Sequence, residues 1–75
     1  MNIEIWGKDQ CPQCDKAIHK AQAMVQETKD TYTILKLGKD FAREDILEHF
    51  PGARTFPQIK IDGNNIGGWT EFQKI

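Results

Sequence analysis

The stretch NIEIWGKDQCPQC, residues 2–14, joins a short strand pattern to a pair of cysteines and the beginning of a helical pattern. In residues 2–6 isoleucines alternate with polar residues, which is typical of a β-strand. From residue 12 to about residue 28 apolar residues recur at intervals of three and four, which predicts an amphipathic helix. Pro12 suits the first helical position, where its missing N–H has no partner in any helix. The stretch therefore predicts a strand, a short loop and a helix that begins at the cysteines.

Shorter elements follow along the rest of the chain. The second helix has Asp40 as a plausible N-cap, and Pro51-Gly52 ends it. The sequence DGNN holds a glycine-containing turn between two strands. Altogether we predict a strand at 30–38, a helix at 40–50, a strand at 57–61, a short return strand that begins at 65–66, and a last helix of at most two turns near 69–75.

The predicted order is β-α-β-α-β-β-α, in a single domain that spans residues 1–75. The first β-α-β unit requires two parallel strands joined by a right-handed crossover, whereas the later hairpin is antiparallel. The simplest architecture is an α/β fold with a four-stranded mixed sheet and helices on both faces. A chain of this length forms only one small core.

The composition excludes several classes of partner. The formal net charge is −1, and no run of like charges resembles a polybasic arm or an acidic tail. No apolar stretch is long enough to cross a bilayer, and the first residues do not resemble a signal peptide. We therefore expect a monomer that binds neither nucleic acid nor membrane. We also expect a cytoplasmic location, where thiols are normally kept reduced.

The chain has only two cysteines, Cys11 and Cys14, and they admit three interpretations. As a structural staple, a disulfide between them closes a loop of about four residues and stabilises the fold by only roughly 2 kcal/mol. A metal site needs four ligands, and the remaining candidates are His19 and His49, with no second CxxC and no HxxxH. We expect both histidines to lie away from the cysteines, so the spacing favours a redox dithiol.

The position of the cysteines on the helix explains how they would act. If Pro12 is the first helical residue, Cys11 is the N-cap and Cys14 is the third helical residue. A thiolate at Cys11 would accept the N–H of Cys14 at the positive end of the helix dipole, which lowers its pKa. Residues three apart at a helix start have Cα atoms roughly 5–6 Å apart, within disulfide range. We expect Cys11, with Lys8 nearby, to attack a substrate disulfide and Cys14 to resolve the mixed disulfide.

Two more stretches are candidates for the walls of the site. Phe56-Pro57 opens the third strand, and base rates favour a trans bond because only about 5–6% of X–Pro bonds are cis. Gly67-Gly68 before Trp69 is either a plain strand-to-helix turn or a place where a ligand carboxylate meets the N–H groups of a helix start. The residues themselves leave both interpretations of the glycine pair open.

Three collinear motifs give the chain a family resemblance: CPQC at 11–14, GARTFPQIKIDG at 52–63 and IGGWTEF at 66–72. Together they resemble a glutaredoxin, a small member of the thioredoxin-like fold. Members of that family typically carry CP-x-C, then TVP, then GG followed by Thr or Asp and an acidic residue. The match extends from Ile3 to about Phe72, nearly the whole chain.

The resemblance implies a thiol-disulfide oxidoreductase in which Cys11 is the nucleophile and Cys14 the resolving thiol. It implies a cis Phe56-Pro57 bond, contrary to the base rate. Glutathione is the implied co-substrate, with no tightly bound cofactor and no metal. Glutathione mixed disulfides and protein disulfides are the implied substrates, and ribonucleotide reductase is a client by family analogy.

The resemblance also implies a glutathione site that several segments build. The cysteinyl and glycyl part of glutathione would be held by Lys8, Thr55, Phe56 and Pro57. The γ-glutamyl end would be received by Gly68, Trp69, Thr70 and Glu71. Two residues would support the site, namely Pro12 and Arg43.

The chain departs from the family pattern at two positions near the expected glutathione site. Phe56 replaces the usual valine, and Glu44, with Arg43 adjacent, stands where many relatives place a glutamine or arginine. Gln13 is shared with NrdH-type redoxins, which take electrons from thioredoxin reductase, so such a redoxin is the main alternative. A metal or iron–sulfur carrier is a further alternative, since some glutaredoxins bridge a [2Fe–2S] cluster, usually with CGFS in place of CPQC.

Overall fold

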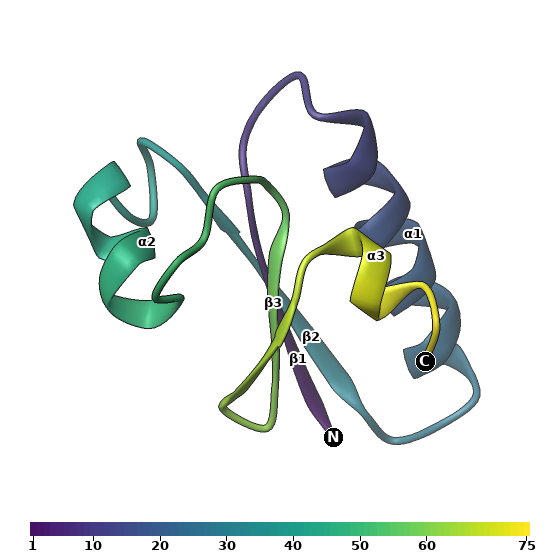
Figure 1. The fold of residues 1–75 in the computed structure, drawn as a ribbon. Coiled ribbons are helices and arrows are strands. Elements are labelled where there is room, and N and C mark those ends of the chain that lie inside the picture. The colour runs from purple at the N-terminus through teal and green to yellow at the C-terminus, as the bar shows by residue number, and fades with distance from the viewer.

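The computed structural model describes residues 1–75 and contains four strands and three helices in the predicted order (Figure 1). The strands are β1 (Asn2–Gly7), β2 (Thr31–Lys36), β3 (Gln58–Ile61) and β4 (Asn64–Gly67). The helices are α1 (Pro12–Gln26), α2 (Arg43–His49) and α3 (Trp69–Phe72). The strands form one sheet in the order β2-β1-β3-β4, in which only β1 and β2 are parallel. The predicted four-stranded mixed sheet is confirmed.

Helices cover both faces of this sheet, as predicted (Figure 1). The alternation of side chains along β1 explains the two layers, because successive residues of a strand point to opposite faces. Ile3 and Ile5 belong to a buried cluster on the face that α1 and α3 cover. Trp6 belongs to a second buried cluster, on the face of α2. The first cluster is completed by Ala17, Ala21, Ile59 and Phe72, and the second by Phe41, Ile46 and Phe50.

The second helix begins later than predicted, at Arg43, and the prediction of Asp40 as its N-cap is wrong. The Asp40 carboxylate instead accepts the backbone N–H of Lys36 at 2.8 Å, which closes the turn after β2. Short Asp side chains commonly bond nearby backbone in this way. The N-cap position is taken by Ala42, whose N–H donates to the Asp45 carboxylate at 2.8 Å.

The pairing of β1 with β3 determines where loops meet. These strands are antiparallel, and Trp6 near the end of β1 lies opposite Gln58 at the start of β3. The loop that leaves β1 toward the cysteines therefore lies beside the loop that enters β3 at Phe56-Pro57.

None of the helices is long and apolar enough to cross a membrane.

Candidate active site at the start of the first helix

Cys11 and Cys14 form a disulfide at the first turn of α1, with their Cα atoms 5.2 Å apart. Cys11 is the N-cap, Pro12 is the first helical residue, and the backbone N–H of Cys14 donates to the Cys11 sulfur at 3.2 Å. The predicted helical position of both cysteines is therefore confirmed. Cys11 is 8% exposed and Cys14 only 2%, so any partner outside the protein reaches Cys11 first.

The loop before the disulfide is held to the neighbouring strand. The Asp9 carboxylate, two residues before Cys11, forms an ion pair with the Lys36 ammonium of β2 at 2.8 Å. The hydrogen bond and the negative charge of Asp9 raise the pKa of Lys36 above its usual value. Gln10 adopts a left-handed backbone conformation, with φ of 53°, which turns the chain from the loop into the helix.

Gly7, the last residue of β1, lies directly behind Cys14. A Cβ atom at this position would be 3.1 Å from the Cys14 sulfur and 3.4 Å from its Cβ. The absence of a side chain at Gly7 thus makes room for the Cys14 sulfur. The sequence pattern places Gly7 in the loop after residues 2–6 and does not indicate this contact, which arises from the packing of α1 on β1.

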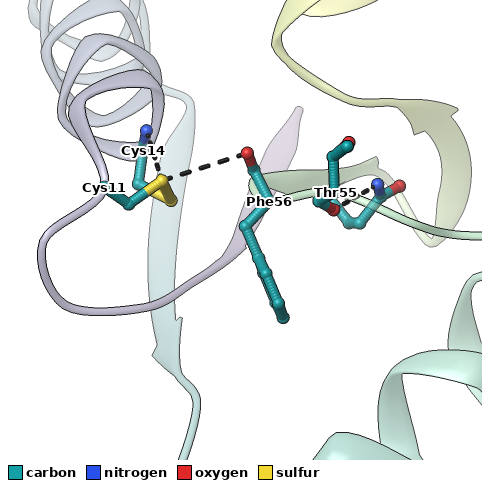
Figure 2. The surroundings of a disulfide bond; sticks show 5 residues. Cys11, Cys14, Thr55 and Phe56 are labelled. Carbon is teal, nitrogen blue, oxygen red and sulfur yellow. Dashed lines mark hydrogen bonds between the residues drawn. A yellow bond between two sulfur atoms is a disulfide. The ribbon is translucent and has the colours of Figure 1, made fainter.

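The Phe56-Pro57 bond is cis, so the base-rate expectation of a trans bond is wrong and the expectation from the family resemblance is confirmed. The Phe56 carbonyl oxygen lies 3.9 Å from the Cys11 sulfur (Figure 2). Because a disulfide sulfur carries no hydrogen, this is a contact and not a hydrogen bond. Pro57 is fully buried, and the Gln58 side chain donates to the Thr55 carbonyl at 2.7 Å.

The glycine pair before α3 makes a close turn. The backbone N–H of Gly68 donates to the Glu71 carboxylate at 2.7 Å. A Cβ at Gly67 would come within 2.9 Å of the Glu71 side-chain carbons, and a Cβ at Gly68 would be 3.2 Å from the Pro57 carbonyl. The glycines therefore allow the turn to pack on Pro57 and Glu71 to fold back. The N–H groups of Trp69 and Thr70, in the first turn, have no partner within the helix.

Two grooves flank the segment 53–55, which both of them share. The first, which we call the α3 groove, has a volume of about 360 Å³. It is lined by Gln13, Thr55, Gly68, Trp69, Thr70 and Glu71, among others. The second, which we call the α2 groove, has a volume of about 570 Å³ and is lined by Lys8, Arg43, Thr55 and Phe56, among others. Most of the predicted binding residues thus line these two grooves, whereas Pro12, Pro57 and the two cysteines line neither.

Several residues that line the grooves were not singled out as site residues. Gln13 lies between the cysteines and lines both grooves, as does Arg54. Ile46 and Leu47 of α2 line the α2 groove beside Arg43. The spacing 43, 46, 47 is a signal for one helix face, but the sequence does not say which face lies next to the cysteines.

The two histidines lie apart from the cysteines. His19 is exposed on α1, and the His49 ring stacks on Trp6 with ring centroids 4.6 Å apart. No cluster of three or more His, Cys, Asp or Glu side chains has the arrangement of a metal site.

Comparison with known proteins agrees with this geometry. The family model for glutaredoxin matches residues 3–66. Glutaredoxin 3 of Escherichia coli strain K12 is 33% identical over 67 residues, which cover 89% of this chain and 76% of the relative. This chain belongs to the glutaredoxin family. Glutaredoxin 1 of the same strain is 31% identical, with 96% of this chain and 88% of the relative covered.

Solved structures place this glutaredoxin in the thioredoxin-like fold. The NMR structure of oxidized E. coli glutaredoxin superposes with a TM-score of 0.84 at 30% identity, covering 99% of this chain and 91% of the other. The structure of reduced E. coli glutaredoxin gives 0.79 at 28% identity with the same coverage. The family membership and the Cys11–Cys14 disulfide make this glutaredoxin a thiol-disulfide oxidoreductase.

Proposed function

We propose that this glutaredoxin takes its electrons from glutathione and reduces protein disulfides or glutathione mixed disulfides. The observation that carries the proposal is the pair of grooves that share Gln13, the residue between Pro12 and Cys14. One groove is lined by Gly68, Trp69 and Thr70 at the start of α3, and the other is lined by the cations Lys8 and Arg43. Glutathione has a carboxylate at each end and a cysteine between them, so a cysteine at Cys11 would direct the two carboxylates into the two grooves.

The chemistry is a pair of thiol-disulfide exchanges. The Cys11 thiolate attacks one sulfur of the substrate disulfide, forms a mixed disulfide and releases the other sulfur as a thiolate, which takes a proton from solvent. Cys14 then loses its proton, attacks the Cys11 sulfur and releases the reduced substrate. The product is the Cys11–Cys14 disulfide. Two glutathione molecules reduce it again and leave as glutathione disulfide, so two electrons pass from glutathione to substrate.

The proposed contacts of glutathione follow the grooves. Thr55, Phe56 and Pro57 would meet the backbone of its cysteine, and Lys8 and Arg43 would pair with the glycine carboxylate. Glu44 lines neither groove, so we assign it no contact with that carboxylate. The γ-glutamyl end would meet the first turn of α3 through the residues Gly68, Trp69, Thr70 and Glu71. Glu71 already accepts the Gly68 N–H, so we assign the carboxylate to Trp69 and Thr70 and the γ-glutamyl ammonium to Glu71.

We further propose that the chain acts as a single-domain monomer in the cytoplasm, with ribonucleotide reductase among its clients. The support for this client is analogy within the glutaredoxin family. The support for a reducing compartment is the chemistry itself, since the enzyme must be returned to the dithiol after each turnover.

Assaying two electron donors side by side tests the proposal. One assay couples glutathione and glutathione reductase to a small glutathione mixed disulfide, and the other supplies thioredoxin reductase. We expect turnover with glutathione and little with thioredoxin reductase. The reverse result would assign the protein to the NrdH-type redoxins instead.

A matched pair of variants tests the glycine contact. Arg43→Gln should raise KM for the glutathione mixed disulfide about fivefold, because an exposed ion pair contributes about 1 kcal/mol. Glu44→Gln, one residue away and outside both grooves, should leave KM unchanged. Equal effects of the two substitutions would rule out a specific contact at Arg43.

A further inference from the structure

The α2 groove concentrates positive charge in a chain whose net charge is −1. Three cationic side chains line it, those of Lys8, Arg43 and Arg54, and no carboxylate does. The α3 groove on the other side of Thr55 has only one cation, Arg54, together with the Glu71 carboxylate. The positive charge is therefore concentrated in the α2 groove and not shared equally by the two grooves.

The face that α2 turns to the groove explains the missing carboxylates. Arg43, Ile46 and Leu47 share one helix face because residues three and four apart are neighbours. The acidic residues of α2 lie elsewhere: Asp45 caps Ala42, and Glu44 and Glu48 line no groove. A helix with more acidic than basic residues thus presents a cation and two aliphatic side chains beside the active site.

Apolar side chains also line the α2 groove, and one of them belongs to Phe56, whose carbonyl contacts the Cys11 sulfur. Leu47 is 57% exposed, although large aliphatic side chains are usually buried. The Phe56 ring also lines the groove, 5.7 Å from the Lys8 ammonium, while the Phe56 carbonyl faces Cys11 (Figure 2). One residue thus connects the groove to the disulfide. Glycine, the residue of glutathione proposed to lie here, has no side chain to cover Leu47.

We propose that the α2 groove binds an acidic segment of a client protein next to its reactive cysteine. Carboxylates of the segment lie near Arg43 and Arg54, and an apolar side chain of the segment covers Leu47. This inference deepens the proposed function, since it rests on protein disulfides being substrates. It adds the chemistry by which such a client is chosen.

The size of the effect follows from the exposure of the cations. Exposed ion pairs contribute little to affinity one by one and are screened by salt. Several cations in one groove act together on the rate of encounter, with accelerations of roughly tenfold or more. The preference for an acidic client is therefore expected in the association rate at low salt.

A single-turnover experiment with the pre-reduced full chain measures this preference. The substrates are synthetic peptides that share one intramolecular disulfide and one leucine beside it, and differ only in whether glutamate, glutamine or lysine flanks them. Neither glutathione nor any reductase is present, and acid-quenched samples give the second-order rate constant of peptide reduction. We expect the glutamate peptide to react about tenfold faster than the lysine peptide at low salt, and the difference to shrink in about 0.5 M salt.

Variants test whether the α2 groove causes the preference for the glutamate peptide. The double variant Arg43→Gln, Arg54→Gln should lose most of the preference for glutamate. The control variant Lys29→Gln, Lys74→Gln changes the net charge equally at exposed positions outside both grooves and should retain it. Leu47→Ala should slow the leucine peptide and not a peptide with serine in that place.

Each outcome decides the inference. Equal rates for the three peptides, or a preference that the control variant loses as fully as the arginine variant, would overturn it. A concentration-dependent dimer that disappears in Leu47→Ala would overturn it too, because a second copy would then occupy the groove. If the peptide preference holds while glutathione fails to reduce the Cys11–Cys14 disulfide, the inference stands and only the proposed electron donor is wrong.

Discussion

The sulfur of Cys11 accepts a hydrogen bond from the backbone N–H of Cys14, 3.2 Å away, at the positive end of a 15-residue helix. In the reduced protein this arrangement stabilises a thiolate at Cys11 more than a thiol. The same turn also contains Asp15, whose negative charge acts in the opposite direction. The balance between these two effects can be measured.

We predict that the pKa of Cys11 in the reduced protein lies below the ordinary value of about 8.5. The ultraviolet absorbance of the thiolate, followed against pH in a Cys14→Ser variant, measures it. The rate of alkylation should rise with pH and level off once Cys11 is fully ionised, earlier than for free cysteine. Asp15→Asn should lower the pKa further. A Cys11 that ionises like free cysteine would refute the proposed activation.

Substitution by serine should affect activity differently at Cys11 and at Cys14. Cys11→Ser should abolish reduction of every disulfide substrate, because only Cys11 is the proposed point of attack. Cys14→Ser should retain reduction of glutathione mixed disulfides, in which a second glutathione resolves the intermediate, and lose most reduction of protein disulfides. Assays of both substrates with both variants check this. Equal residual activity in the two variants would contradict the assigned roles.

The contact between Gly7 and Cys14 predicts a defect confined to the resolving step. In Gly7→Ala the new methyl group would be 3.1 Å from the Cys14 sulfur, so this sulfur must shift to make room. We expect slower closure of the Cys11–Cys14 disulfide and accumulation of the mixed disulfide, with the first attack by Cys11 unchanged. Rapid-quench mass spectrometry separates the two steps. Closure at the wild-type rate would mean that the resolving sulfur tolerates the methyl group.

Phe72 should contribute much of the stability of the short last helix. It is fully buried among Ile3, Ile5 and residues of α1. Phe72→Ala should lower the free energy of unfolding by about 3–5 kcal/mol, a large share of the roughly 5–15 kcal/mol of a typical domain. Urea unfolding measures the loss. The exposed Leu47→Ala should change stability by less than about 0.5 kcal/mol, and comparable losses in both variants would refute this account.

Sequence alone predicts the features that depend on local chemistry. The strand before the cysteines, Pro12 at the first helical position and Cys11 as N-cap all follow from a few adjacent residues, and the structure confirms them. Asp40 was mistaken for a helix cap because an Asp serves equally well in a turn, where it bonds Lys36. The choice between these uses depends on where the chain goes next.

Features that depend on tertiary packing cannot be predicted from the residues alone. The cis bond at Pro57 contradicts the base rate, and only the family resemblance implied it. Leu47 and Arg54 belong to the α2 groove because α2 and the segment before β3 come together in space. The local sequence around Leu47 does not indicate this placement, and Arg54 lies within the motif GARTFPQIKIDG without a predicted role.

The placement of α2 separates two properties of the enzyme. Ile46 of α2 is anchored by Trp6, Phe41 and Phe50 on one face of the sheet, whereas the cysteines belong to α1 on the other. Substitutions in that aromatic anchor should retune which proteins are accepted while the acidity of the attacking sulfur stays the same. The sheet thus separates the aromatic cluster that positions α2 from the helix that carries the cysteines.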